Sequence, residues 1–255
     1  MPAGKLYPIS EIFGPTIQGE GPLAGTRTFF VRFAGCDFDC LWCDTKYAIR
    51  PSYPGWTKEM MTIGDINDKL YSLGAVPAGA KNRQEWVTLS GGNPALFVDS
   101  QFEATMSMHY RLAMETQGSS LINLPTLAKI DCLVISPKPP SSGMANRFDK
   151  ADIIQILDKR WTTQITALKY VIFNEDDLEW VADVDRMVGA APWVRRYLSV
   201  GTPLDLMGVD PMNNDGPIIV GFRQLAEIVK TDPRFKHFIA SLQQHVLLWG
   251  QKRGV

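Results

Sequence analysis

Short apolar, β-branched or aromatic runs alternate with amphipathic stretches along the chain, and this alternation limits its possible folds more than any other feature. Six runs have the length and composition of strands: residues 28–34, 86–90, 110–116, 132–136, 168–173 and 196–200. Strand–helix alternation is typical of a parallel sheet covered by helices. The pattern therefore predicts an α/β fold with about six parallel strands, as an open barrel or a doubly wound sheet.

Three amphipathic stretches have the periodicity of helices. Apolar residues recur every three or four positions over residues 63–73 and again over 148–160, which places them on one helix face. Asn174 is the expected N-cap of a third helix over Glu175–Val188. The acidic residues that follow Asn174 fit the first turn of such a helix, because negative charge is favourable at a helix N-terminus.

Polar residues, glycine and proline follow five of the six strand candidates. These tips are residues 35–36, 90–94, 115–118, 136–138 and 199–202. The carboxyl ends of parallel strands meet at one edge of the sheet, and ligands bind at that edge. Such residues after a single strand are explained by an ordinary turn. Their presence after five strands predicts the rim of an active site.

The composition excludes several classes of function. With 26 Lys and Arg against 27 Asp and Glu, the net charge is −1, whereas non-specific nucleic-acid binding needs a basic surface. A hydrophobic fraction of 45% is that of a folded protein. No run approaches the roughly 18 apolar residues of a membrane span, and the first residues show no apolar signal core. We therefore expect a cytoplasmic protein without nucleic-acid or membrane partners.

Three of the four cysteines, Cys36, Cys40 and Cys43, lie within eight residues directly after the first strand candidate. Such close cysteines make a poor disulfide framework in a chain of 255 residues, so a metal site is the better interpretation. Structural zinc needs four ligands, and no second pair or nearby histidine is present. Cys132 precedes Ser136 by four residues, about 13 Å along a strand, so we expect it to be buried and inert.

Three thiolates without a fourth suit a [4Fe–4S] cluster with one iron left open. The C-x3-C-x2-C spacing after the first strand resembles the radical S-adenosylmethionine (SAM) superfamily. The segment Gly91-Gly92-Asn93-Pro94 resembles the SAM-binding glycine motif of that superfamily, with Asn93 where Glu is commoner. An amide oxygen at Asn93 can still accept a hydrogen bond from the SAM ammonium group. Phe38 and Trp42 either shield such a cluster from solvent or are ordinary core aromatics.

Longer segments resemble one family within that superfamily, the 7-carboxy-7-deazaguanine synthases. The similar segments are residues 11–21, 136–142 and 248–255, and the resemblance runs from about Ile9 to the last residue. It implies an incomplete (β/α) barrel of radical SAM type. It also implies one domain over residues 1–255, in which an N-terminal substrate loop and a C-terminal tail close the site.

The same resemblance implies the reaction and its partners. Members of the family convert 6-carboxy-5,6,7,8-tetrahydropterin to 7-carboxy-7-deazaguanine with loss of ammonia. They use a [4Fe–4S] cluster, SAM and Mg²⁺, and are commonly homodimers. An external reductant of the flavodoxin or ferredoxin type is expected.

The resemblance also implies a set of site residues. The cluster ligands are Cys36, Cys40 and Cys43, and the Mg²⁺ ligand is Thr45. The SAM-binding residues are Gly92, Ser136, Pro137, Lys138, Ser199, Val200, Gly201 and Thr202, with Ser199 where relatives carry Gln. The substrate-binding residues are Ile17, Gln18, Gly19, Glu20, Arg32, Ser90, His245 and Val255. No catalytic side chain is expected beyond the cluster and SAM.

Arg32 is expected to bind the substrate carboxylate through its planar fork. Without the resemblance, Arg32 could be a salt-bridge residue, Lys138 a solvated surface group and His245 a structural histidine.

Two other functions stay open at this point. A radical SAM enzyme that activates a partner protein by forming a glycyl radical would use the same cysteines, but it gives no reason for the 18–20 loop or for Arg32. A zinc- or cluster-stabilised interaction domain would need a fourth ligand that the cysteine spacing does not supply.

Overall fold

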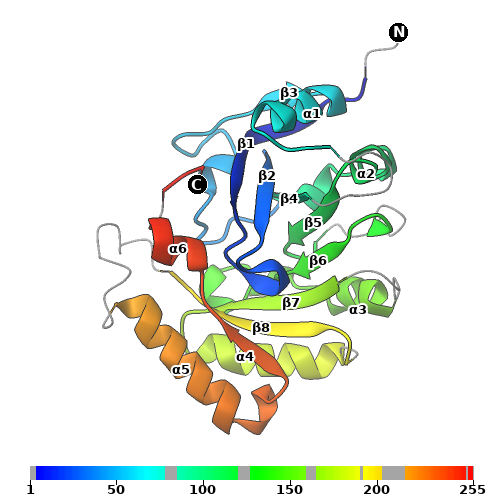
Figure 1. The fold of residues 1–255 in the computed structure, drawn as a ribbon. Coiled ribbons are helices and arrows are strands. Elements are labelled where there is room, and N and C mark those ends of the chain that lie inside the picture. The colour runs from blue at the N-terminus through cyan, green and yellow to red at the C-terminus, as the bar shows by residue number, and fades with distance from the viewer. Residues whose placement is uncertain are drawn as a thin grey trace.

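Nine strands form one open sheet in the described part of the computed structural model, which covers residues 4–77, 85–119, 127–158, 165–189, 192–202, 216–250 and 252–254. Their order across the sheet is β3-β1-β2-β4-β5-β6-β7-β8-β9. All neighbours from β2 to β9 are parallel, whereas β1 is antiparallel to both β2 and β3. Figure 1 shows the sheet curving from β3 to β8 without closing, with α6 and the C-terminus on its open side. This is the predicted incomplete barrel.

The strands are β1 Tyr7–Ile17, β2 Arg27–Phe33, β3 Glu59–Met61, β4 Trp86–Gly91, β5 Arg111–Thr116, β6 Cys132–Ile135, β7 Ile165–Ile172, β8 Arg195–Val200 and β9 Phe238–Ser241. The six predicted strands are β2 and β4 to β8, with ends that differ by up to three residues. The other three strands were not predicted. Pro15 interrupts the pattern of β1, and it is tolerated there because β3 pairs only with Tyr7–Ile9 at the other end of that strand.

The described α-helices are α1 Ile63–Ser72, α2 Ser100–Ser107, α3 Lys150–Asp158, α4 Glu175–Val188, α5 Pro217–Thr231 and α6 Gln244–Trp249. The predicted bounds of α4 are confirmed, and Asn174 Oδ1 accepts a hydrogen bond from the backbone N–H of Asp177 at 3.0 Å. Helix α3 begins two residues later than predicted, because Asp149 caps it by accepting a hydrogen bond from Ala151 N. Within the described residues no helix is long and apolar enough to cross a membrane.

The two faces of the sheet have different roles, as β2 illustrates. Phe29, Val31 and Phe33 are fully buried in the main core, which also takes in residues of α1 to α5. The alternate residues Phe30 and Arg32 face the other way and line a pocket. Because side chains alternate along a strand, one face of the sheet stabilises the fold and the other is available for a site.

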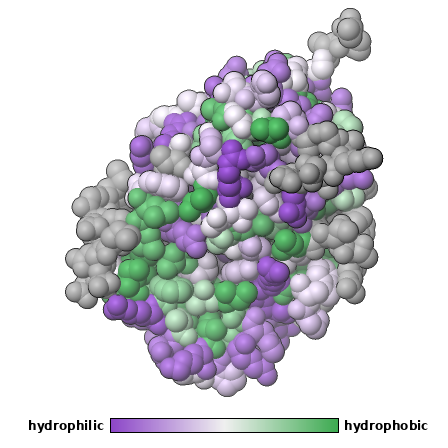
Figure 2. All heavy atoms as spheres, in the orientation of Figure 1, coloured by the Kyte–Doolittle hydropathy of each residue, from purple (hydrophilic) through white to green (hydrophobic). Residues whose placement is uncertain are grey.

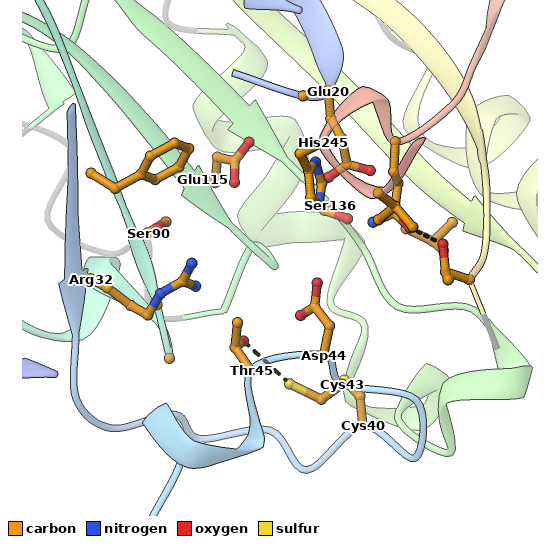
Figure 3. Close-up of a pocket in the computed structure, with 18 of the residues that line it drawn as sticks. Glu20, Arg32, Cys40, Cys43, Asp44, Thr45, Ser90, Glu115, Ser136 and His245 are labelled. Atoms are coloured by element: carbon orange, nitrogen blue, oxygen red, sulfur yellow. Dashed lines mark hydrogen bonds between the residues drawn. The ribbon is translucent and has the colours of Figure 1, made fainter. Parts of the chain in front are cut away.

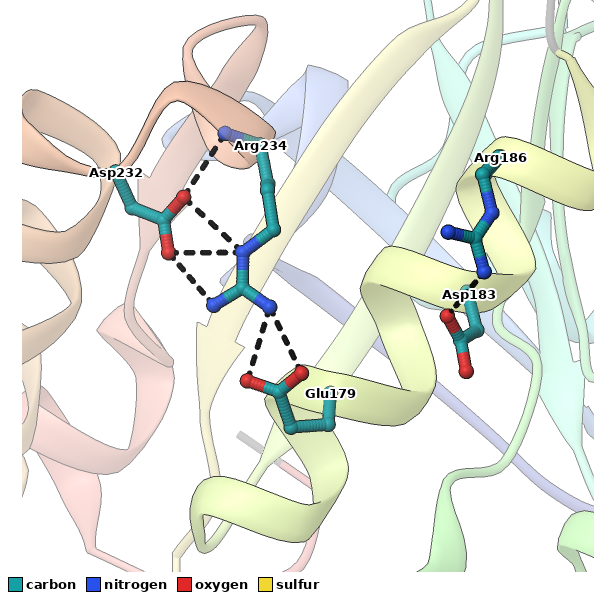
Figure 4. A network of polar contacts seen from close by, with 5 residues as sticks. All are labelled: Glu179, Asp183, Arg186, Asp232 and Arg234. Atoms are coloured by element: carbon teal, nitrogen blue, oxygen red, sulfur yellow. Dashed lines mark hydrogen bonds and ion pairs between the residues drawn. The ribbon is translucent and has the colours of Figure 1, made fainter.

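The segment before β9 is tied to α4 by charged groups (Figure 4). Arg234 donates to both carboxylate oxygens of Glu179, at 2.9 and 2.8 Å, and to Asp232 at 2.7 Å, while Asp183 and Arg186 pair within α4. These pairs are largely exposed, so they fix the local geometry of the turn and add little to stability.

Candidate active site

A pocket of about 290 Å³ lies on the inner face of the sheet and at the carboxyl ends of its strands (Figure 3). The strands and strand tips supply Phe30, Arg32, Ser90, Gly91, Gly92, Glu115, Thr116, Gln117, Val134, Ser136, Lys138, Lys169 and Thr202. The loop after β1 supplies Ile17 to Glu20, and the segment from Gln243 to Gly254 supplies another wall. The structure thus brings the predicted strand tips together around one cavity.

The three clustered cysteines all line this pocket, and all are free thiols. The loop that carries them is held by backbone hydrogen bonds from Cys36 N to Ile49 O and from Leu41 N to Ser142 O. Burial raises the pKa of the Cys36 thiol to about 12 and that of Cys43 to about 11. A metal group bound here would therefore have to displace thiol protons.

The arrangement of thiols fits an iron–sulfur cluster better than a single metal ion. Among the described residues, no three His, Cys, Asp or Glu side chains converge on one ion position, whereas each cysteine of a cluster binds a different iron atom. Cys132 is fully buried in β6 against Leu23 and Trp86 and does not line the pocket. Its predicted burial is confirmed, and the zinc interpretation loses its candidate fourth thiol.

Phe38 and Trp42 line the pocket beside the cysteines. Phe38 is buried, and Trp42 donates from Nε1 to Ser141 Oγ at 3.0 Å and lies 5.1 Å from the ring of Phe173. Both aromatic residues thus pack against the protein interior, as ordinary core aromatics do, and both face the pocket.

Gly92 fits only as glycine, because the loop after β4 packs backbone against backbone on the loop after β2. A Cβ on Gly92 would lie 1.9 Å from Gly35 O, and Asn93 N donates to the same oxygen at 2.8 Å. Gly92 itself lines the pocket. This contact fixes the glycine segment directly beside Cys36.

The side-chain oxygen of Asn93, considered above as an acceptor for SAM, has partners within the protein. Its side chain is fully buried, and its oxygen accepts hydrogen bonds from Ala95 N at 3.2 Å and Thr116 Oγ1 at 2.8 Å. Its amide nitrogen donates to Asp37 at 3.1 Å, and Gln117 donates to the same Asp37 oxygen. Asn93 therefore links the cysteine loop to the ends of β4 and β5 from outside the pocket lining.

Arg32 and Ser90 lie side by side on neighbouring strands and both face the pocket. Arg32 pairs with Glu11, as the salt-bridge interpretation predicts, yet its guanidinium group also points into the cavity (Figure 3). Ser90 Oγ is buried without a hydrogen-bond partner among the described residues. A buried polar atom in this state leaves a hydrogen bond for a ligand to complete.

Glu20 lies across the pocket from Arg32 (Figure 3) and forms a buried ion pair with Lys169, with Nζ 2.6 Å from Oε2. Burial alone would raise the pKa of Glu20, but the charges of Lys169 and His245 outweigh it and lower the pKa to about 2. Ser199 Oγ donates to the other carboxylate oxygen at 3.2 Å. Glu20 is therefore a carboxylate under all ordinary conditions.

The loop at residues 18–20 is packed against α6. A Cβ on Gly19 would lie 2.1 Å from His245 Nδ1, and Gln244 N donates to Gly19 O at 3.0 Å. Gln18 Nε2 donates to Glu115 at 3.1 Å. The predicted substrate residues from the two ends of the chain, His245 included, thus meet in one wall.

Thr45 lines the pocket next to Asp44, and both side chains point into it (Figure 3). Thr45 Oγ1 lies 3.6 Å from Cys43 Sγ. One hydroxyl and one carboxylate are a partial oxygen set, which suits Mg²⁺ because that ion usually keeps waters or substrate oxygens in its shell.

The predicted SAM-binding residues divide into two groups. Gly92, Ser136, Lys138 and Thr202 line the pocket, and Lys138 Nζ donates to Ser136 Oγ at 3.1 Å. The residues outside the lining are Pro137, Ser199, Val200 and Gly201. Val255, expected to bind substrate, lies outside the described residues.

Lys169, Asp44 and Tyr47 line the pocket but were not identified from the sequence, whereas Glu115 belongs to a predicted strand tip. For Lys169 a signal was present: it stands between Leu168 and Tyr170 in an otherwise apolar strand. A lysine at a position that alternation turns away from the core requires a polar partner on the inner face.

The curved parallel sheet with three thiols at its carboxyl edge defines a fold of radical SAM type. The crystal structure of QueE from Escherichia coli has the same fold, with a TM-score of 0.61 and 17% identity over 94% of this chain and 95% of that one. No protein-family model matches the chain.

Relatives that are similar over the full length of the chain identify its family. The 7-carboxy-7-deazaguanine synthase of Bacillus subtilis is 39% identical over 98% of this chain and 99% of its own, and that of Bacillus cereus is 36% identical over 97% and 98%. The chain belongs to the 7-carboxy-7-deazaguanine synthase family.

Proposed function

We propose that this protein converts 6-carboxy-5,6,7,8-tetrahydropterin to 7-carboxy-7-deazaguanine with release of ammonia, as a radical SAM enzyme. The observation that carries the proposal is the pocket itself: Cys36, Cys40 and Cys43 line it, and Figure 3 shows Cys40 and Cys43 on one side of two recognition groups of opposite charge. Arg32 and the unpartnered Ser90 hydroxyl suit a carboxylate. Glu20, on the far side, suits the amino and amide edge of a pterin.

Cys36, Cys40 and Cys43 would hold three irons of a [4Fe–4S] cluster, with SAM beside Gly92, Ser136 and Lys138. A cluster and SAM bound there would supply the radical chemistry for hydrogen abstraction from the substrate. Phe38 and Trp42 would limit the access of water to that radical.

The protein residues position the substrate. The Glu20 carboxylate, kept charged by Lys169, accepts hydrogen bonds from the heterocycle, and Gln18 adds an amide at the same end. Thr45 and Asp44 supply oxygen atoms for Mg²⁺ near Arg32. Fixing both ends of a flat substrate sets which carbon faces the cluster.

Anaerobic incubation with SAM, dithionite, Mg²⁺ and the carboxytetrahydropterin tests this function. We expect an ultraviolet-absorbing product with the mass of 7-carboxy-7-deazaguanine and no product when SAM is omitted. Absence of product from cluster-loaded protein would refute the proposal. Activation of a partner protein is not favoured, because Arg32, Ser90 and Glu20 enclose a pocket sized for a small molecule.

We infer that the protein is a cytoplasmic homodimer of single-domain subunits that takes electrons from a flavodoxin or ferredoxin. Support for a dimer comes from an apolar area over α5 and α6 (Figure 2), where Val220, Leu248 and Trp249 are at least 37% exposed. Light scattering of the cluster-loaded protein should give twice the chain mass of 28.5 kDa. Val220→Lys should shift this mass toward the monomer, and a monomeric wild-type protein would contradict the inference.

A further inference from the structure

Glu11 binds three residues that line the pocket, although it does not line the pocket itself. It lies in β1 opposite Arg32 in β2, and Arg32 Nε donates to its Oε1 at 2.8 Å. The hydroxyl of Tyr47 donates to the same oxygen at 2.8 Å. Arg253, near the end of the chain, donates from Nε to Oε2 at 2.8 Å.

The bond to Glu11 determines which nitrogen atoms of Arg32 are available. A guanidinium group can bind a carboxylate through Nε and one terminal nitrogen, or through both terminal nitrogens. Glu11 occupies Nε, and the two terminal nitrogens of Arg32 have no hydrogen-bond partner within the described residues. Arg32 therefore directs its two terminal nitrogens at the cavity, next to the Ser90 hydroxyl, which has no hydrogen-bond partner in the described part of the chain.

Further contacts and burial hold the partners of Glu11 in place. The guanidinium of Arg253 stacks on the ring of Tyr47 at 3.9 Å, and its terminal nitrogen donates to Thr57 Oγ1 at 3.1 Å. The side chains of Glu11 and Arg32 are each only 15% exposed. At this depth an ion pair is screened less than at the surface, and its orientation is held more firmly.

We propose that Glu11 is a positioning residue that makes the pocket selective for a carboxylate-bearing ligand. It holds Arg32 with both terminal nitrogens directed at the ligand carboxylate. Through Arg253 it also fixes residues 252–254 as a wall of the same pocket. The inference rests on the proposed function, because it takes the ligand to be a carboxypterin.

The test compares two stable ligands on the cluster-loaded protein with SAM and without reductant. The ligands are 6-carboxypterin and pterin, which lacks the carboxylate. The measured quantity is the dissociation constant of pterin divided by that of 6-carboxypterin. In Glu11→Gln, whose side chain has nearly the same shape, we expect the affinity for 6-carboxypterin to fall roughly tenfold. The affinity for pterin should stay within about twofold, so the ratio falls with it.

Three further variants separate positioning from a general structural role. Tyr47→Phe removes one donor from Glu11 and should lower the ratio by a smaller factor. Arg253→Gln leaves the Glu11–Arg32 bond in place, so it should preserve the ratio, with each affinity within about twofold of the wild type. Glu85→Gln breaks the pair with Arg27 at the other end of β2 and should change neither affinity.

Each outcome bears on one of the two proposals. Equal wild-type affinity for both ligands would refute the carboxypterin function. A wild-type preference for 6-carboxypterin that Glu11→Gln retains, or an equal loss of both affinities in that variant, would overturn the role of Glu11.

Discussion

Cys40→Ala is expected to abolish both cluster assembly and turnover. Cys40 lines the pocket with Cys36 and Cys43, and among the described residues no further cysteine lines it as a replacement ligand. Two thiolates cannot hold a cluster that also keeps one iron open for SAM. Iron and sulfide analysis after anaerobic reconstitution, together with the broad visible absorbance, should show no stable cluster.

Cys132→Ala is the matched control for Cys40→Ala. Cys132 is fully buried in β6 and lies away from the pocket lining, so its loss should cost roughly 0.5–3 kcal/mol of stability. Iron content and turnover should equal those of the wild type. A full cluster in Cys40→Ala, or its loss in Cys132→Ala, would show that the ligand assignment is wrong.

Lys169→Met is expected to have the largest effect on stability. The substitution leaves the Glu20 carboxylate buried beside an apolar side chain, and breaking a buried ion pair in this way costs about 3–5 kcal/mol. Urea unfolding followed by circular dichroism measures the loss. The double variant Lys169→Met/Glu20→Gln should recover most of it, because a neutral amide is far less costly to bury than a charge.

The same pair predicts a pH dependence. The pKa of Glu20 is lowered to about 2 in the folded protein from its ordinary value of 4.5, so its stabilising contribution is present above pH 4.5 and is lost as the pH falls toward 2. In Lys169→Met, burial acts without the ammonium charge and favours the protonated acid. The deficit of this variant relative to the wild type should therefore begin to shrink above pH 4.5, where Glu20 of the variant takes up its proton, and shrink further as the pH falls from 4.5 toward 2. A constant deficit would exclude the ion pair as its cause.

Much of the fold and part of the site could be predicted because their signals are local in the sequence. The six predicted strands are apolar runs, α4 follows a capping asparagine, and the cysteine spacing lies within eight residues. The position of Lys169 could have been inferred from alternation, but its partner could not. Glu20 lies 149 residues away from it.

The contacts of Glu11 show why the rest could not be predicted. Glu11 and Arg253 lie in the segments 11–21 and 248–255 that resemble the family, but nothing in those segments marks the two residues as partners, since charged residues are common on surfaces. Their contact depends on how β1, β2 and the C-terminal segment are placed in space. Strand β9 was missed for a similar reason: four residues carry too little periodicity, and the strand exists because β8 offers it a parallel edge.

The bond between Glu11 and Arg253 spans 242 positions of the chain. Contacts of such long separation form late in folding, because a large loop must close first. Residues 252–254 can take their place in the pocket wall only when β1 is in the sheet, because Glu11 is the partner of Arg253. The completeness of the pocket therefore reports on the correct assembly of two segments that are remote in sequence.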